Sequence, residues 1–145
     1  MMTYPRILFP VDLSKQSQVV AEHVATMVDK FDSELHMVHV IVNFKSPTFA
    51  SVNDVMDEIK HNTLKELDAF AASHFPHLTK LKTKVLIGHS GRQILSYMEK
   101  QNISLVVMGT HGRSGLGTAF FGSVAQRVVQ SAKVPVLTVH PVHGA

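Results

Sequence analysis

Short apolar runs alternate with segments of helical periodicity along this chain, and this alternation constrains the fold more than any other feature of the sequence. Five runs have the nearly continuous apolar composition of strands buried on both faces. They cover residues 6–11, 35–42, 82–88, 104–108 and 134–140. Strands that are separated by helices pair in parallel through right-handed crossovers. The sequence therefore predicts an open, five-stranded parallel sheet in a three-layer αβα sandwich.

Four segments between these runs carry apolar residues at helical spacing. Ser14 is a candidate N-cap of the first helix, and Pro76 ends the second. Residues 43–51, which contain Pro47, are expected to form a loop. The predicted inward-facing residues of the four helices are, in order, Val20, Val24, Met27, Val28 and Phe31; Val52, Val55, Met56, Ile59, Leu67 and Phe70; Ile94, Leu95 and Met98; and Val124, Val128 and Val129.

Length and composition limit the class of protein. A chain of 145 residues is expected to form a single domain, residues 1–145. The absence of cysteine removes disulfides, thiolate metal sites and cysteine nucleophiles. Apolar stretches of about seven residues are too short for a membrane span, and the N-terminus lacks a signal-peptide layout. We therefore expect a cytoplasmic protein without membrane contact. A net charge of +3 is too small an excess to predict nucleic-acid binding.

A glycine-rich stretch, residues 109–122, follows the fourth predicted strand. In doubly wound sheets, ligands bind beyond the carboxyl ends of the strands, where the strand order reverses. Glycine lets backbone N–H groups approach a ligand, and the free N–H groups of a helix start favour an anion. Ser123 would add a hydroxyl donor at the start of the fourth helix. This stretch is therefore expected to bind phosphate.

Two familiar phosphate-binding motifs are absent from the sequence. A P-loop requires Gly-Lys-Ser/Thr, which occurs nowhere in the chain. The dinucleotide fingerprint fails because Gly115 and Gly117 are followed by Phe120, and because this loop follows the fourth strand rather than the first. These differences argue against a P-loop nucleotide triphosphatase and against a Rossmann dehydrogenase.

The spacing of Gly109, Gly112 and Gly122-Ser123 resembles the G-2x-G-9x-G-[S/T] motif of ATP-binding universal stress proteins. The surrounding segments are similar in the same order, namely ILFPVDLS, HVIV, VVMGTHGRSGL and GSVAQRVVQSAKVPVLTV, so the resemblance covers nearly the whole chain. It implies a single-domain, Rossmann-like fold of the adenine nucleotide alpha hydrolase type. It also implies the strand order 3-2-1-4-5.

The resemblance further implies an ATP site, with Mg²⁺, made by residues that follow the first, second and fourth strands: Pro10, Val11, Asp12, Val40, Met108, Gly109, His111, Gly112, Gly122, Ser123 and Val124. Asp12 would accept hydrogen bonds from a ribose hydroxyl or help to hold a metal–phosphate group. Val40 would form an apolar wall against adenine, and Met108 would lie under the nucleoside. His111 would face the phosphates, which the backbone from Gly122 onward would bind.

Ten histidines raise the question of a metal site, which their spacing does not support. His36 and His39 are three residues apart on a predicted strand, so their side chains point to opposite faces of the sheet. Neither a His-Glu-x-x-His motif nor a Cys-His array is present. We expect no dedicated metal site, and His111 is the histidine with a predicted ligand-binding position.

The leading hypothesis is an adenine nucleotide-binding protein of stress response and signalling. Efficient phosphoryl transfer uses a positioned cation, a metal ion and a water-orienting residue. Only fragments of that set are visible, so at most slow ATP hydrolysis or self-phosphorylation is expected. The resemblance also implies a homodimer through the last strand, residues 135–140, because sheet edges tend to be paired or protected. A further protein partner is expected but not identified by the sequence.

Two other functions stay open at this point. A nucleotide-independent dimeric scaffold would resemble the branch of the family that lacks the glycine motif, which is intact here. A nucleotidyl-transfer enzyme on a similar sheet would carry a His-x-x-His or His-Ile-Gly-His element after the first strand. Here Asp12-Leu13-Ser14 occupies that place, so this alternative ranks last.

Overall fold

A computed structural model describes residues 1–42, 51–111 and 121–141, with the backbone alone for residues 51–53. Five strands form one parallel sheet in the order β3-β2-β1-β4-β5. They are β1 (Arg6–Pro10), β2 (Glu34–Val42), β3 (Leu81–Gly88), β4 (Leu105–Gly109) and β5 (Val136–Val139). The predicted sheet and strand order are confirmed, and the strand bounds lie close to the predicted ones.

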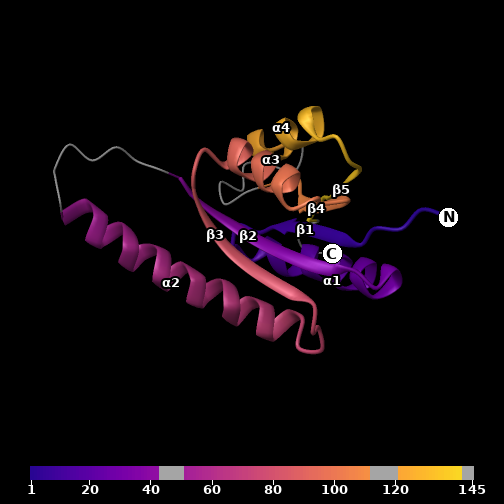
Figure 1. Ribbon diagram of the computed structural model, residues 1–145, viewed down its shortest axis with the longest axis horizontal. Coiled ribbons are helices and arrows are strands. Elements are labelled where there is room, and N and C mark those ends of the chain that lie inside the picture. Colours follow the sequence, from indigo (N-terminus) through magenta and orange to yellow (C-terminus); the bar gives the residue numbers. More distant parts are fainter. Residues whose placement is uncertain (43–50, 112–120, 142–145) are drawn as a thin grey trace.

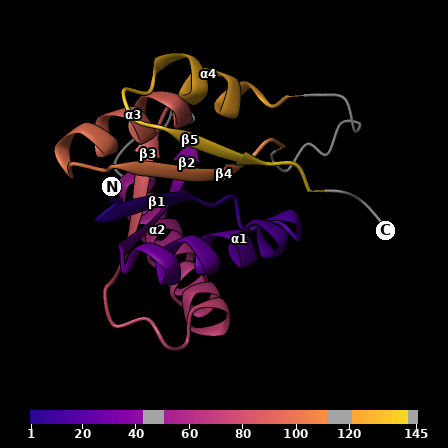
Figure 2. The same ribbon diagram turned by 90° about the vertical axis from the view of Figure 1, so that its right-hand side faces the viewer.

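Four helices cover the sheet in two layers. They are α1 (Gln16–Phe31), α2 (Ser51–His74), α3 (Ser90–Lys100) and α4 (Ser123–Ser131). Figure 1 shows α3 and α4 on one face of the sheet and α1 and α2 on the other. The view turned by 90° gives the same three layers (Figure 2). The predicted αβα sandwich is therefore confirmed.

The central strand, β1, contributes to both hydrophobic cores. Ile7 and Phe9 pack with α1 and α2, and Leu8 between them packs with α3 and α4. All three side chains are almost completely buried. Full burial of such a side chain stabilises a fold by about 1.5–3 kcal/mol. Residues 7–9 of the strand are continuously apolar, as expected where both faces are covered.

Some details of the predicted helices are wrong. The N-cap of α1 is Lys15, which makes no side-chain capping bond, and the Ser14 hydroxyl instead donates to Asp12. Val129 and Val55 are 45% and 52% exposed, so neither side chain is buried in its predicted stripe. Figure 1 shows that the N-terminal half of α2 extends beyond the sheet. The predicted loop 43–51 lies outside the described residues, except for Ser51, which begins α2.

The two edges of the sheet differ in charge. Edge strand β3 carries Lys82 and Lys84, and Lys80 precedes it. Lysines on an edge strand oppose pairing with another strand. Edge strand β5 has the uncharged sequence VLTV, and its Leu137 is 38% exposed. The β5 edge is therefore the less protected of the two.

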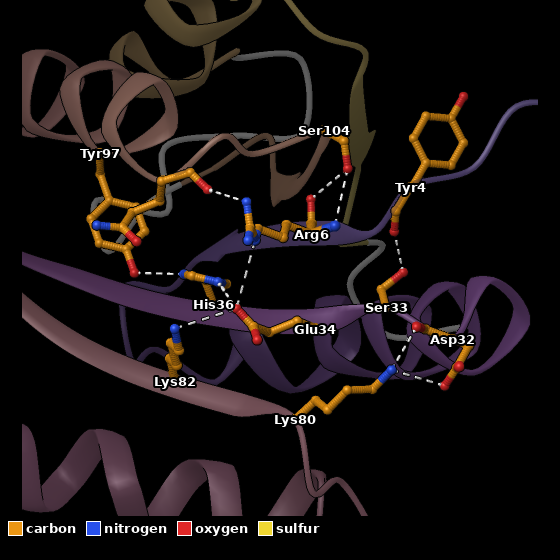
Figure 3. A network of polar contacts seen from close by, with 11 residues as sticks. Tyr4, Arg6, Asp32, Ser33, Glu34, His36, Lys80, Lys82, Tyr97 and Ser104 are labelled. Atoms are coloured by element: carbon orange, nitrogen blue, oxygen red, sulfur yellow. Dashed lines mark hydrogen bonds and ion pairs between the residues drawn. The ribbon is translucent and has the colours of Figure 1, made fainter.

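A buried histidine lies at the centre of a polar network near the amino ends of the strands (Figure 3). His36 Nε2 is 2.6 Å from Glu34 Oε1, and His36 Nδ1 is 2.7 Å from the Tyr97 hydroxyl. Because a carboxylate can only accept, Nε2 carries the proton, and Nδ1 of the neutral ring accepts from Tyr97. The Glu34 carboxylate also lies 3.6 Å from Lys82 Nζ and 3.9 Å from Arg6 Nε.

Burial lowers the pKa of His36 below its ordinary value of 6.5, although Glu34 opposes this effect. The hydrogen bond from His36 lowers the pKa of Glu34 below 4.5. The unfolded chain therefore binds protons at both groups more readily than the folded chain does. As pH falls through about 6.5 and then through about 4.5, each group contributes less to stability, because proton uptake favours the unfolded state.

We predict that His36→Gln makes stability less dependent on pH. Glutamine has an amide donor and a carbonyl acceptor but does not reproduce the geometry of the ring, so the free energy of unfolding should fall by about 1–3 kcal/mol at pH 8. The fall should be smaller at pH 5.5, because His36 itself contributes less to stability there. Urea unfolding at the two pH values measures the difference. His23→Gln, at an exposed position on α1, controls for the loss of an imidazole. An equal cost of His36→Gln at both pH values would contradict the linkage.

Candidate functional site

A cavity of about 290 Å³ lies at the carboxyl ends of β1, β2 and β4, between the starts of α1, α3 and α4. The sheet order places β2 and β4 on either side of β1, so the strand order reverses at this edge. Such switch points are the usual ligand sites of open α/β sheets. The lining residues are Phe9, Pro10, Val11, Asp12, Gln16, Ser17, Val20, Val38, His39, Val40, Ser90, Ile94, Met108, Gly109, Thr110, His111, Gly122, Ser123, Val124 and Ala125.

The structure brings the predicted site residues together around this one cavity. They come from the end of β1, from β2, from the end of β4 and from the start of α4: Pro10, Val11, Asp12, Val40, Met108, Gly109, His111, Gly122, Ser123 and Val124. Gly112, the remaining predicted residue, lies outside the described residues. Their roles toward a ligand stay predictions.

Asp12 is fixed by hydroxyl groups at the start of α1. Its Oδ1 accepts from Ser14 N at 3.0 Å, from Ser14 Oγ at 2.6 Å and from Ser17 Oγ at 2.6 Å. Leu13, between Asp12 and Ser14, has a φ of 63°. A bulky residue in the left-handed region is costly and occurs mostly where the surrounding structure enforces it, often at functional sites. The turn after β1 therefore holds the carboxylate at the cavity in one orientation.

His39 lines the cavity and was missed by the sequence analysis as a site residue. Its Nδ1 lies 2.7 Å from the carbonyl oxygen of Val11. A carbonyl only accepts, so Nδ1 carries a proton and the ring fixes the backbone just before Asp12. The signal in the sequence was its place beside Val40 near the carboxyl end of a strand. His36 and His39 contact different elements, as their spacing predicts.

The start of α4 forms another wall of the cavity. Its N-cap is Gly122, which has no side chain to accept from the N–H groups of the first turn. These N–H groups have no partner within the helix, and the helix dipole adds positive potential there. Ser123, Val124 and Ala125 all line the cavity. This wall has the donors and the field that an anion requires.

Thr110 and two histidines form a polar cluster beside this wall. The Thr110 hydroxyl lies 2.9 Å from His111 Nδ1 and 3.1 Å from His140 Nδ1. The two imidazole rings have centroids 4.9 Å apart. His111 Nε2 is buried, and it finds no hydrogen-bond partner among the residues that the structure describes. Burying an unpaired polar atom is costly, so a ligand group that bonded it would remove that cost.

Gly109 owes its place partly to packing. A Cβ atom there would lie 3.2 Å from Val20 Cγ2 on α1. The missing side chain thus lets the end of β4 approach α1 closely, beside the cavity.

Within residues 1–42, 54–111 and 121–141, no three or more histidine, aspartate or glutamate side chains are grouped so that they could hold a metal ion. In the same part of the chain, no helix combines the length and the apolar character that crossing a membrane requires.

The sequence model of the universal stress protein family matches residues 3–140. Among curated proteins, the chain is 30% identical over 142 residues to universal stress protein MJ0531 of Methanocaldococcus jannaschii. That alignment covers 94% of this chain and 82% of the relative.

Solved structures of the same family have the same fold. The universal stress protein UspA from Lactobacillus plantarum aligns with a TM-score of 0.80 at 21% identity, over 96% of this chain and 99% of that one. A universal stress protein solved in complex with cAMP aligns with a TM-score of 0.68 at 18% identity, over 97% and 100%. One from Archaeoglobus fulgidus in complex with dAMP aligns with a TM-score of 0.59 at 16% identity, over 95% and 98%.

We predict that Asp12→Asn destabilises the fold in the absence of any ligand. The charge-assisted bonds that Asp12 Oδ1 accepts from Ser14 and Ser17 become neutral bonds, at a cost of about 1–3 kcal/mol. Chemical denaturation measures the change. Asp29→Asn, at an exposed position on α1, is the matched control. Equal stability of the two variants would mean that the turn does not depend on the Asp12 carboxylate.

Proposed function

Since the chain belongs to the universal stress protein family, we propose that it is an adenine nucleotide-binding module of the stress response whose ligand is ATP with Mg²⁺. One observation carries the proposal: all the residues nominated by the family resemblance that the structure describes, which leaves out only Gly112, line a single cavity at the uncapped start of α4. One of these residues, His111, has a buried Nε2 atom without a hydrogen-bond partner in the described part of the chain. In this proposal the module acts in the cytoplasm.

The two sides of the cavity suit the two ends of a nucleotide. Val40, Ile94 and Met108 belong to the hydrophobic cluster between the sheet and the α3–α4 layer, and they give the cavity an apolar wall. That wall would receive the adenine ring. The first turn of α4 and the Ser123 hydroxyl would bind the phosphates, because N–H groups at a helix start favour anions.

Structural relatives support an adenine nucleotide over other anions. The universal stress protein complexes that share this fold hold cAMP in one case and dAMP in another. Both ligands combine an adenine base with a phosphate group. Since their sequence identity to this chain is low, the argument for this chain rests on its own cavity and motif.

Asp12 would serve the sugar or the metal. Its carboxylate is held at the cavity by Ser14 and Ser17, so it would accept from a ribose hydroxyl or help to hold Mg²⁺ beside the phosphates. Bound Mg²⁺ would supply charge neutralisation for the phosphate oxygens. The described lining supplies hydroxyls, imidazoles and one carboxylate. Fast phosphoryl transfer relies on a fuller set of groups, so we expect binding with at most slow hydrolysis or self-phosphorylation.

The β5 edge would pair two copies of the chain. It is uncharged, whereas the β3 edge carries lysines. Leu137 on β5, Val129 on α4 and Phe121 before α4 are large exposed apolar residues. Pairing of two β5 strands would satisfy the edge backbone groups and cover apolar surface. A homodimer could then present the nucleotide state to a further protein partner.

We predict that Gly122→Val abolishes most ATP affinity while the fold survives. Gly122 has φ −59° and ψ 149°, which any residue can adopt, so the added side chain crowds the ligand without straining the backbone. Losing the phosphate contacts would weaken binding by about tenfold or more. Calorimetric titration with ATP and Mg²⁺ measures the affinity, after chromatography of any nucleotide released from denatured protein.

Gln130→Val, at an exposed position toward the other end of α4, is the matched control and should bind ATP like the wild type. Wild-type affinity in Gly122→Val would remove the site assignment. A folded wild-type protein that neither carries nor binds nucleotide would leave the nucleotide-independent scaffold as the function.

We predict that Leu137→Lys converts a homodimer into a monomer. A lysine on this edge adds charge repulsion and removes apolar contact at the proposed interface. Gel filtration with light scattering at micromolar concentration measures the mass. Val42→Lys, at a 64% exposed valine on β2, should leave the mass unchanged. A monomeric wild-type protein would overturn the β5 interface.

A further inference from the structure

Thr110 connects three elements of the cavity wall. It follows β4 directly, and its backbone N–H donates to Val139 O on β5 at 3.0 Å. Its carbonyl accepts from Gly122 N, at the start of α4, at 2.7 Å. Its side chain is buried, with 6% exposure. The residue thus joins the end of the edge strand to the wall proposed to bind phosphate.

The Thr110 hydroxyl lies between two imidazole nitrogens, His111 Nδ1 and His140 Nδ1, at 2.9 and 3.1 Å. A hydroxyl has one proton, so it can donate to only one of them. In neutral rings the bonds are satisfied when one Nδ1 carries a proton and donates, and the other accepts. The two histidines then have opposite tautomers. The hydrogen-bond chain His111–Thr110–His140 can therefore run in either of two directions.

We propose that the Thr110 hydroxyl couples the tautomer of His111, at the cavity, to the tautomer of His140, beyond β5. A phosphate oxygen bound at His111 would select one direction of this hydrogen-bond chain. Thr110 is a positioning residue in this inference, since it acts on the ligand through His111. The inference deepens the proposed function and rests on it for the identity of the phosphate-bearing ligand.

The direction follows from the chemistry of phosphate, which accepts hydrogen bonds. Its partner must be an Nε2–H group on His111, so His111 Nδ1 is bare and accepts the Thr110 proton. The Thr110 oxygen then accepts from a protonated Nδ1 on His140, whose own Nε2 is bare. Relative to the opposite direction, one proton is gained at His111 Nε2 and one is released to water from His140 Nε2. The net charge is unchanged.

His140 carries the result to the molecular surface. It directly follows β5 and is exposed. Selection of one direction turns His140 Nε2 from a donor into an acceptor for groups outside the domain. A copy or partner docked at the β5 edge would meet a different hydrogen-bonding group in the nucleotide-bound state. The cavity and the edge would be coupled without a backbone movement.

Long-range proton–nitrogen correlation spectra of the ¹⁵N-labelled full chain distinguish the tautomers, near pH 8 where ordinary imidazoles are neutral. His111→Asn and His140→Asn assign the two signals among the ten histidines. In the free wild-type protein, the two rings should have opposite tautomers. With ATP and Mg²⁺, His111 should carry its proton on Nε2 and His140 on Nδ1. The same tautomer in both rings of the free protein would overturn the coupling, whether or not ATP binds.

Thr110→Val removes the hydroxyl at constant shape, and Thr110→Ser retains it. The valine variant should lose the Nδ1 proton on His140 with ATP bound and bind ATP about 5- to 20-fold more weakly, whereas serine stays within about twofold of wild type. Circular dichroism checks the fold of both. If wild type binds ATP but His140 keeps its proton on Nε2, the inference fails and the proposed function stands. If wild type binds no ATP, the proposed function fails with it.

Discussion

Burial of β1 on both faces is the constraint on which the rest of the structure depends. Ile7 and Phe9 belong to one core and Leu8 to the other, so helices must cover this strand on both faces. β1 pairs with β2 on one side and with β4 on the other, so the connections on its two sides run in opposite directions. A crevice therefore opens at the carboxyl end of β1. The Asp12 turn, the end of β4 and the start of α4 meet there as a result.

Much of this arrangement is predictable because its signals are local. Strands buried on both faces are apolar without a break, so 6–11 and 104–108 are recognisable in isolation. The glycine spacing from Gly109 to Gly122 lies within one segment and nominates one wall of the cavity. The family resemblance, and not any local pattern, predicts that residues from the first two strands lie at the same site. It does so because it reflects a three-dimensional arrangement that no single segment contains.

The two contacts that the sequence analysis missed, those of His140 and His39, both join segments that are distant in the sequence. His140 meets Thr110 because β5 pairs with β4 in a register that sets Val139 beside Gly109. His39 reaches Val11 through the pairing of β2 with β1. Neither contact leaves a local pattern. Ser14 is a good N-cap by type, but Asp12 offers its hydroxyl a stronger, charged acceptor, and the helix starts one residue later than a Ser14 cap implies.

The buried His36 network lies at the opposite end of the strands from the cavity. Glu34 and Arg6 begin β2 and β1, and Lys82 is near the start of β3. A drop in cellular pH would therefore act, through this network, on how much of the protein is folded. Unfolded chains are open to proteases. The abundance of the protein, set by degradation, would then report acid stress.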